Sequence, residues 1–137
     1  MSNEKLALIA NTVRTEIIEM LYSAGSGHSA GSLGMADIFV ALYFKLMNIN
    51  PQKPDWSNRD RLILSCGHIC PVWYATLAER GYFNKKELKN LRKCGSFLQG
   101  HPHRNLDYGI ENTSGPLGQG YSQAVGVALA GRMNQEK

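Results

Sequence analysis

The sequence contains few cysteines and no long apolar run. Its three cysteines form an odd set without the spacing of a disulfide framework, which excludes a small disulfide-stapled secreted domain. No apolar stretch approaches the roughly 18 residues that a membrane span requires. The N-terminus, which reads MSNEK, lacks the apolar segment of a secretory signal. We therefore expect a cytoplasmic chain with no membrane partner.

A basic motif interleaved with aromatic residues is also missing, so nucleic acid is not an expected partner, although the net charge is +4. The densest basic stretch, Lys85 to Lys93, is interpreted as the solvated face of a helix. A basic surface also suits anionic sugar phosphates, but net charge alone supports this weakly. With 137 residues, 43% of them hydrophobic, the chain has the length and composition of one globular domain with a modest core.

The spacing of apolar residues predicts a chain rich in helices. Steps of three and four predict an amphipathic helix from about Ser2 to Ala24, broken by the glycines that follow. A second helix is expected to begin near Ser32 or Gly34 and to turn one row of side chains inward: Met35, Ile38, Leu42 and Leu46. The proline-containing stretch 48–58 is typical of an irregular surface connection.

The second half of the chain offers one strand candidate. The apolar run Arg61–Ser65 predicts a strand buried on both faces, which would bring Gly67-His68 to its carboxyl end, where α/β sheets place ligand sites. Pro71 favours the first turn of a following helix, and Gly81 its end. One strand among five helical segments cannot complete a doubly wound sheet. The predicted fold class is therefore a helix-rich part of a larger α/β architecture.

Weaker signals fill the rest of the chain. Asn84 followed by Glu87 resembles a capping box for a short helix that ends near Lys93. Residues 95–114 show little periodicity and are expected to form a loop. A last helix is predicted over residues 120–133, with alanines and glycines that permit close packing.

Three histidines follow glycines at expected junctions between elements: His28, His68 and His101. A glycine-rich loop, Gly115–Gly120, comes shortly after the third. Imidazoles that converge from such loops are suited to exchanging protons with a hydroxyl-rich substrate near neutral pH. The recurrence of the pattern predicts a sugar-handling enzyme.

The residues around these histidines resemble a known family. The runs SGHSAGSLG (26–34), RDRLILSCGH (59–68), LQGHP (98–102) and TSGPLGQG (113–120) are similar in order and spacing to the N-terminal part of transketolases. The resemblance extends from about Ala7 to Met133. It implies the fold of a thiamine-diphosphate-binding domain and the transfer of two-carbon ketol units between sugar phosphates.

The resemblance also implies roles for individual residues. His28, His68 and His101 would be catalytic, with His28 and His101 contacting hydroxyl and carbonyl oxygens of the donor. His68 would lie beside the cofactor diphosphate and the reacting centre, and would also count among the cofactor-binding residues. The others are expected at the aminopyrimidine ring: Gly115, Pro116 and Leu117.

The implied cofactors are thiamine diphosphate and Mg²⁺ or another divalent metal. The Gly-Asp-Gly run that holds the metal in this family is missing, and we expect it after Lys137, so no metal ligand is assigned to this chain. Residues 1–137 would thus be a partial domain. Complementary transketolase chains would supply the metal motif and the pyrimidine-binding domain, and this chain would be inactive without them. The assembled enzyme would be a dimer.

Several alternatives stay open. Dihydroxyacetone synthase, which uses the same cofactor, would share these loops, whereas deoxyxylulose-phosphate synthase fits less well. A truncated, non-catalytic assembly module is also compatible with the missing metal motif. The cysteines at 66, 70 and 94, with His101 and His103, suggest zinc, but they lack the CxxC spacing of a zinc site. His103 is interpreted as a solvated loop residue, and the cluster 59–61 as an Arg–Asp pair at the entrance of the strand.

Overall fold

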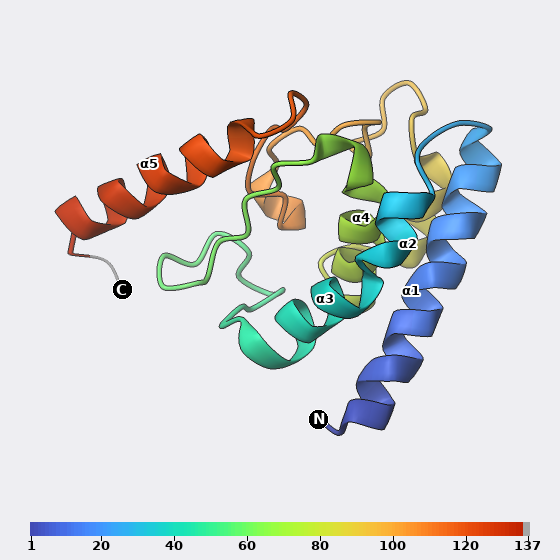
Figure 1. Ribbon diagram of the computed structural model, residues 1–137, viewed down its shortest axis with the longest axis horizontal. Helices are drawn as coiled ribbons and strands as arrows, with labels where there is room; N and C mark the ends of the chain where they lie inside the picture. Colours follow the sequence, from blue (N-terminus) through green and yellow to red (C-terminus); the bar gives the residue numbers. More distant parts are fainter. Residues whose placement is uncertain (136–137) are drawn as a thin grey trace.

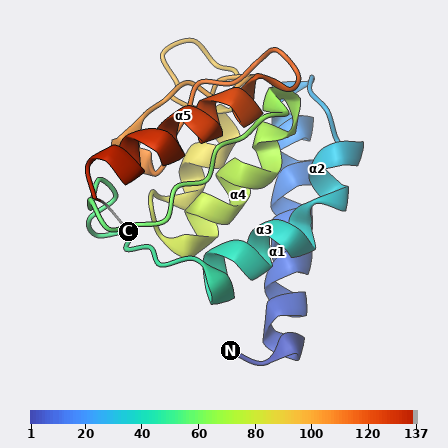
Figure 2. The same cartoon turned by 60° about the vertical axis from the view of Figure 1, so that its left-hand side comes forward.

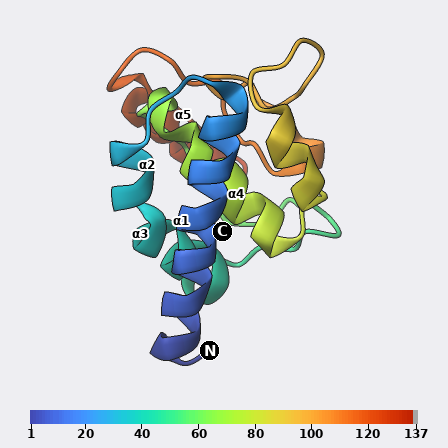
Figure 3. The ribbon, with the colours of Figure 1, turned by 90° about the vertical axis from the view of Figure 1, so that its right-hand side faces the viewer.

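Helix α4 (Cys70–Arg80) lies at the centre of the molecule. In the computed structural model, which describes residues 1–135, every side chain of α4 from Cys70 to Ala78 is buried. Helix α1 (Asn3–Ala24), the short helices α2 (Ala30–Gly34) and α3 (Ala36–Ala41), and the 3₁₀ helix η3 (Lys85–Asn90) pack around it (Figures 1 and 3). Because α4 is apolar on all sides, it can be stable only when it is enclosed in this way.

Helix α1 has the bounds and the buried face that its sequence predicts. Ser2 caps it by accepting a hydrogen bond from the Lys5 N–H at 3.3 Å, and Gly25 ends it in the left-handed conformation. The predicted stripe contributes four fully buried residues: Ala10, Val13, Ile17 and Met20. At the end of α4, Gly81 likewise takes the left-handed conformation, and Pro71 lies in the first turn, as expected.

The second predicted helix is divided into three pieces, and part of its predicted inward face is wrong. Helices α2 and α3 meet at Met35, and the last turn is a π-helix, η1 (Leu42–Leu46). Ile38 and Leu46 are 50% and 67% exposed. Because the segment is apolar on more than one face, its spacing did not fix which face packs inward. The buried apolar residues are Ala36, Phe39, Val40 and Tyr43.

Helix η3 also differs from its prediction. It is a 3₁₀ helix that ends at Asn90, and Asn84 caps it by accepting a hydrogen bond from the Lys86 N–H at 2.9 Å. The Glu87 carboxylate accepts a hydrogen bond from the Asn90 amide instead of completing a capping box with Asn84. Leu88 is buried while Lys86 and Lys89 are exposed, so the basic stretch does form a solvated face.

The predicted strand over residues 61–65 is wrong: this segment is a coil, and no strand occurs within residues 1–135. It follows a stretched-out path beside α5 (Gln119–Met133), as Figures 1 and 2 show from two directions. A strand needs a neighbouring strand to accept and donate its backbone hydrogen bonds. Here the backbone of Leu64 is paired with the side chain of Asn112 instead.

The predicted loop 95–114 contains one short 3₁₀ helix, η4 (Leu106–Tyr108).

Helix α5 occupies the predicted segment but is barely packed against the rest of the molecule. It extends to one side, opposite the edge formed by α1 (Figure 1), and of its residues only Gly120 is buried. The predicted close packing of its small residues is therefore not seen within residues 1–135. Its large apolar side chains point into solvent: Tyr121, Val125, Val127, Leu129 and Met133. None of the helices over residues 1–135 has the length and apolarity to cross a membrane.

A half-buried charge cluster joins α1 to α4 and η3. Lys85 forms ion pairs with Glu79 and, at 3.3 Å, with Glu16. Burial, followed by a hydrogen bond and repulsion from Glu79, raises the pKa of Glu16 to about 7. One carboxylate oxygen of Glu16, Oε2, is buried without a hydrogen-bond partner among the described residues. The folded state thus favours protonated Glu16.

We predict that Glu16 makes the stability of the fold fall as the pH rises. Because its pKa is higher in the folded chain than the ordinary 4.5, the folded state binds the extra proton, and this stabilisation is lost as the pH rises from about 4.5 through 7. Glu16→Gln should flatten the dependence of Tm on pH across this window. Glu19→Gln, on the same helix but exposed, is the control and should keep the slope. An unchanged slope in Glu16→Gln would contradict the assignment.

Candidate functional site

Two of the three predicted histidines face each other. His28 and His68 have ring centroids 5.3 Å apart, with the rings at 64° in an edge-on arrangement. His28 follows α1, and the buried hydroxyl of Ser32 in α2 donates a hydrogen bond to its carbonyl oxygen at 3.1 Å. His68 lies in the 3₁₀ helix η2 (Gly67–Ile69), which leads directly into α4. The start of α2 and the start of α4 thus place the two imidazoles together.

The third histidine reaches the same place through Gly67. A Cβ atom on Gly67 would lie 2.9 Å from His101 Cδ2 and 2.8 Å from the backbone oxygen of Ser114. Both distances are shorter than real Cβ contacts, so the close approach of the loops requires glycine here. The structure therefore brings together the loops of His28, His68 and His101, as the sequence predicts.

The loop that carries His101 is held against α4 by buried polar groups. The Tyr74 hydroxyl donates a hydrogen bond to the carbonyl oxygen of Gln99 at 2.9 Å, and the Cys70 thiol donates to that of Gly100 at 3.3 Å. Burial raises the pKa of Cys70 to about 12 and also raises that of Tyr74. Both side chains therefore remain neutral donors at physiological pH, and Cys70 is a structural thiol and not a nucleophile.

The glycine-rich loop lies beside the histidine loops. The Gly118 N–H donates a hydrogen bond to the Ser65 carbonyl oxygen at 3.3 Å, and a Cβ on Gly120 would lie 2.5 Å from Ser65 Cα. Gly118 has a φ of 88°, which places it in the left-handed region before α5 begins. In contrast, Gly115 faces open space, and Pro116 and Leu117 are exposed. The start of the loop is thus free to contact a ligand, while its end is packed.

Asn112 connects these loops, and the sequence pattern did not reveal it. Its buried amide accepts a hydrogen bond from the Leu64 N–H at 2.9 Å and donates to the Leu64 carbonyl oxygen at 3.0 Å. It also donates to Gln123 Oε1 in α5 at 2.8 Å. One side chain therefore joins the segment before His68, the loop before Gly115, and α5. A buried asparagine in a loop has no spacing signal, so only the fold identifies it.

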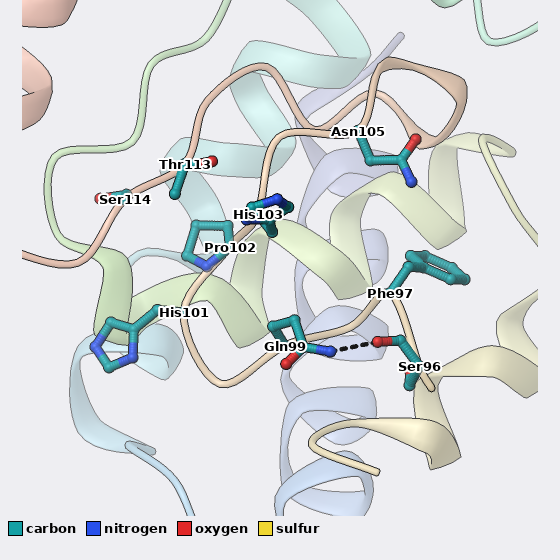
Figure 4. Close-up of a pocket in the computed structure, with 9 residues that line it drawn as sticks. All are labelled: Ser96, Phe97, Gln99, His101, Pro102, His103, Asn105, Thr113 and Ser114. Carbon is teal, nitrogen blue, oxygen red and sulfur yellow. Dashed lines mark hydrogen bonds between the residues drawn. The ribbon is translucent and has the colours of Figure 1, made fainter. Parts of the chain in front are cut away.

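Next to His101, a groove with a volume of about 450 Å³ opens between residues 96–105 and 113–114 (Figure 4). Phe97 lines one side of it, and His101 lies at the other end and points away from Phe97. Ser114 also lines the groove, its backbone lies against Gly67, and its Oγ is buried without a hydrogen-bond partner among the described residues. A buried hydroxyl without a partner is costly, so a ligand atom at this position would be stabilising.

The remaining candidate residues have different surroundings. His103 is exposed and lines the groove, which agrees with its interpretation as a solvated loop residue. Arg59 does hold the entrance of segment 61–65, but its partner is Glu111, at 2.6 and 2.9 Å, and not an aspartate. Asp60 instead accepts a hydrogen bond from the Asn48 N–H at 2.7 Å. The hydrogen bond with Glu111 raises the pKa of Arg59, so this guanidinium stays charged.

The cysteines do not gather into a metal site in the described part of the chain. Cys66 and Cys94 are exposed, while Cys70 is buried against the 99–100 backbone. Within residues 1–135, no three His, Cys, Asp or Glu side chains lie close enough together to hold an ion. A small zinc protein is thus not supported by the arrangement of these residues.

Comparisons with known proteins match this chain to one family. A family described as "Transketolase, thiamine diphosphate binding domain" matches residues 5–137. A curated relative, a 6-deoxy-6-sulfo-D-fructose transketolase subunit from Clostridium sp. strain MSTE9, is 46% identical over 125 residues, which cover 91% of this chain and 46% of the relative. The chain thus spans less than half the length of the curated relatives it matches.

Solved structures give the same result. The transketolase from Leishmania mexicana matches with a TM-score of 0.88 and 40% identity, over 95% of this chain and 19% of that protein. A transketolase from Pichia stipitis in complex with sedoheptulose-7-phosphate matches with a TM-score of 0.84 and 40% identity, over 94% of this chain and 19% of that protein. The fold described above is therefore shared with one part of much longer proteins.

We predict that Asn112→Ala lowers the free energy of unfolding by roughly 2–4 kcal/mol, because it leaves the buried N–H and carbonyl of Leu64 without partners. Urea titration of the purified chain, followed by circular dichroism, measures this loss. Thr113→Ala is the control, since the exposed Thr113 hydroxyl only accepts one hydrogen bond, from the Arg104 N–H. If Asn112→Ala is no less stable than Thr113→Ala, the amide of Asn112 does not organise the site.

Proposed function

Because the chain belongs to the transketolase family and carries the N-terminal part of its thiamine diphosphate binding domain, we propose that it is a portion or subunit of an active transketolase. The proposed reaction is the transfer of two-carbon ketol units between ketose and aldose phosphates. The observation that carries this proposal is the convergence of the loops of His28, His68 and His101 at the Gly67 backbone. The solved relative from Pichia stipitis was obtained with a sugar phosphate, which supports the same substrate class.

The histidines have complementary tasks in this proposal. His28 and His101 orient the hydroxyl and carbonyl oxygens of the donor sugar, and each neutral imidazole accepts or donates one proton. His68, beside His28, contacts both the substrate and the cofactor. The rings of His28 and His68 lie edge-on with centroids 5.3 Å apart, so one ligand can contact both imidazoles. This chain therefore contributes positioning and proton transfer.

The residues present fit a flat heterocycle next to the histidines. Gly115 faces open space, Pro116 and Leu117 offer exposed apolar surface, and the buried Ser114 hydroxyl lacks a partner among residues 1–135. We assign Gly115, Pro116 and Leu117 to the aminopyrimidine ring of thiamine diphosphate. When bound, the cofactor supplies the nucleophilic carbon that accepts the ketol unit. We propose that Mg²⁺ or another divalent metal is held by ligands outside this chain.

We propose that companion segments, which are transketolase segments outside this chain, complete the enzyme. Helix α5 is apolar on nearly all sides, and such a helix belongs in a protein interior. A groove of about 530 Å³ and another of about 520 Å³ lie along it, and both include Ile63 of the coil segment and Val127 of α5. We propose that complementary transketolase segments fill these grooves, supply the metal motif and the pyrimidine-binding domain, and form a cytoplasmic dimer. Turnover would require them.

Purification of the chain from its source cell tests this proposal. Intact mass, co-purifying chains and ketol transfer from a ketose phosphate to an aldose phosphate are measured on the same material. We expect active material that contains the companion segments. Transfer of the ketol unit to formaldehyde, with dihydroxyacetone as the product, would instead identify a dihydroxyacetone synthase. A chain found alone and inactive would contradict the proposal and favour a non-catalytic assembly module, which the exposed faces of α5 would also suit.

We predict that His101→Ala in the assembled enzyme lowers kcat by about 10²–10⁴-fold, the range typical of general acid–base catalysis. The Kd for thiamine diphosphate, measured by fluorescence quenching, should change little, because His101 is assigned to the donor sugar. His103→Ala, two positions further along the same loop, is the matched control and should retain near-normal turnover. Equal turnover in the two variants would contradict the role of His101.

A further inference from the structure

Arg92 is a residue of unusual backbone conformation next to two of the histidine loops. Its φ of 63° lies in the left-handed region, which a residue other than glycine seldom adopts without a compensating interaction. Its N–H donates a hydrogen bond to the Leu98 carbonyl oxygen at 2.8 Å, which closes the turn 92–98. This conformation directs the Arg92 side chain toward Gly100 and Ser26, and not along the basic face of η3.

The guanidinium of Arg92 bridges the loops of His101 and His28. It covers the backbone of Gly100 so closely that a Cβ there would lie 2.9 Å from Nε and 3.0 Å from Cζ. On its other side, Nη1 donates a hydrogen bond to the Ser26 hydroxyl at 3.3 Å, and Nε lies 4.0 Å from the Cβ position of Gly27. One exposed side chain thus lies against Gly100, which precedes His101, and is hydrogen-bonded to Ser26, two residues before His28.

We propose that Arg92 is a positioning residue that sets the separation of His28 and His101. The two loops approach Arg92 from different parts of the fold, because the 26–28 loop follows α1 and the 99–101 loop is fixed to α4 by Cys70 and Tyr74. Without the guanidinium, two side-chain hydrogen bonds hold the 26–28 loop within residues 1–135. The Ser32 hydroxyl donates to the His28 carbonyl oxygen at 3.1 Å, and the Ser26 hydroxyl donates to the nearby Ala24 carbonyl oxygen at 3.4 Å. Neither of these bonds reaches the His101 loop. The consequence for turnover rests on the proposed function; the geometric consequence does not.

Arginine suits this position for a physical reason. Its planar guanidinium lies flat over a glycine backbone and still directs N–H groups sideways, whereas a lysine ammonium is a compact point charge without a flat face. The missing side chain of Gly100 is part of the same arrangement. Gly100→Ala should therefore push the guanidinium aside without removing it.

The first test measures geometry in the full chain, without substrate. Nitrogen spectra of ¹⁵N-histidine-labelled protein report the ring environment of each histidine. In Arg92→Asn, which tolerates the left-handed conformation, the signals of His28 and His101 should both shift, while that of His103 stays in place. Lys93→Ala is the matched control, because Lys93 contacts only Asn90 Oδ1 among the side-chain bonds described for it, and should shift none of them. Unchanged His28 and His101 signals in Arg92→Asn would overturn the proposal.

A double-mutant cycle separates positioning from a general loss of stability. Gly100→Ala should reproduce the shifts of Arg92→Asn, and adding Gly100→Ala to Arg92→Asn should produce little further change, because the displaced group is already gone. Arg92→Lys should be intermediate. Additive shifts in the double variant would show that Gly100 and Arg92 act separately, and would overturn the proposed bridge.

The assembled enzyme gives the functional readout. Arg92→Asn should lower kcat by about tenfold or more, since small displacements of a positioned group are costly, with Tm and the Kd for thiamine diphosphate unchanged. A fall of Tm that accounts for the lost activity would show a merely structural role. If the spectra show the bridge but no assembly transfers ketol units, the proposed function fails and the geometric inference stands. If wild-type assembly is active and Arg92→Asn is equally active, the positioning role fails alone.

Discussion

The arrangement of the site depends on a single buried amide. Asn112 accepts from and donates to the backbone of Leu64, as a neighbouring strand would, and its remaining N–H reaches Gln123 in α5. Since the segment around Leu64 leads into Gly67-His68 and the segment after Asn112 leads into Gly115, this pairing fixes the distance between the predicted substrate and cofactor contacts. The buried Arg59–Glu111 pair lies directly before it and reinforces the same junction.

The helices form a rigid base that holds the histidine loops in place. Helix α4 is buried over most of its length. It directly follows η2, which carries His68, and its first turns carry Cys70 and Tyr74, which anchor the His101 loop. Helix α2 holds His28 through Ser32. Each histidine loop is fixed to a buried helix. The conformational entropy of these loops is therefore lost when the chain folds, and not when a ligand binds.

The sequence predicted the elements whose pattern is local and repeated. The stripe of α1, the ends of α4 at Pro71 and Gly81, and the place of α5 all follow from spacing and capping rules. The inward face of 35–46 and the strand at 61–65 were predicted wrongly, because each depends on what lies across from it. The three histidine loops were expected to converge, and they do. Asn112, Ser114 and Arg92 were missed, since a polar residue in a loop has no periodicity and its role comes from partners distant in sequence.

The exposed apolar surface of α5 affects how much of this chain persists in a cell. Its apolar residues are the kind of surface that chaperones and quality-control proteases recognise when it is left uncovered. Under the proposed assembly, copies synthesised in excess of their companion segments would be removed, and covered copies would persist. The steady-state amount of this polypeptide would then be set by the supply of whatever encloses α5, and less by the rate of its own translation.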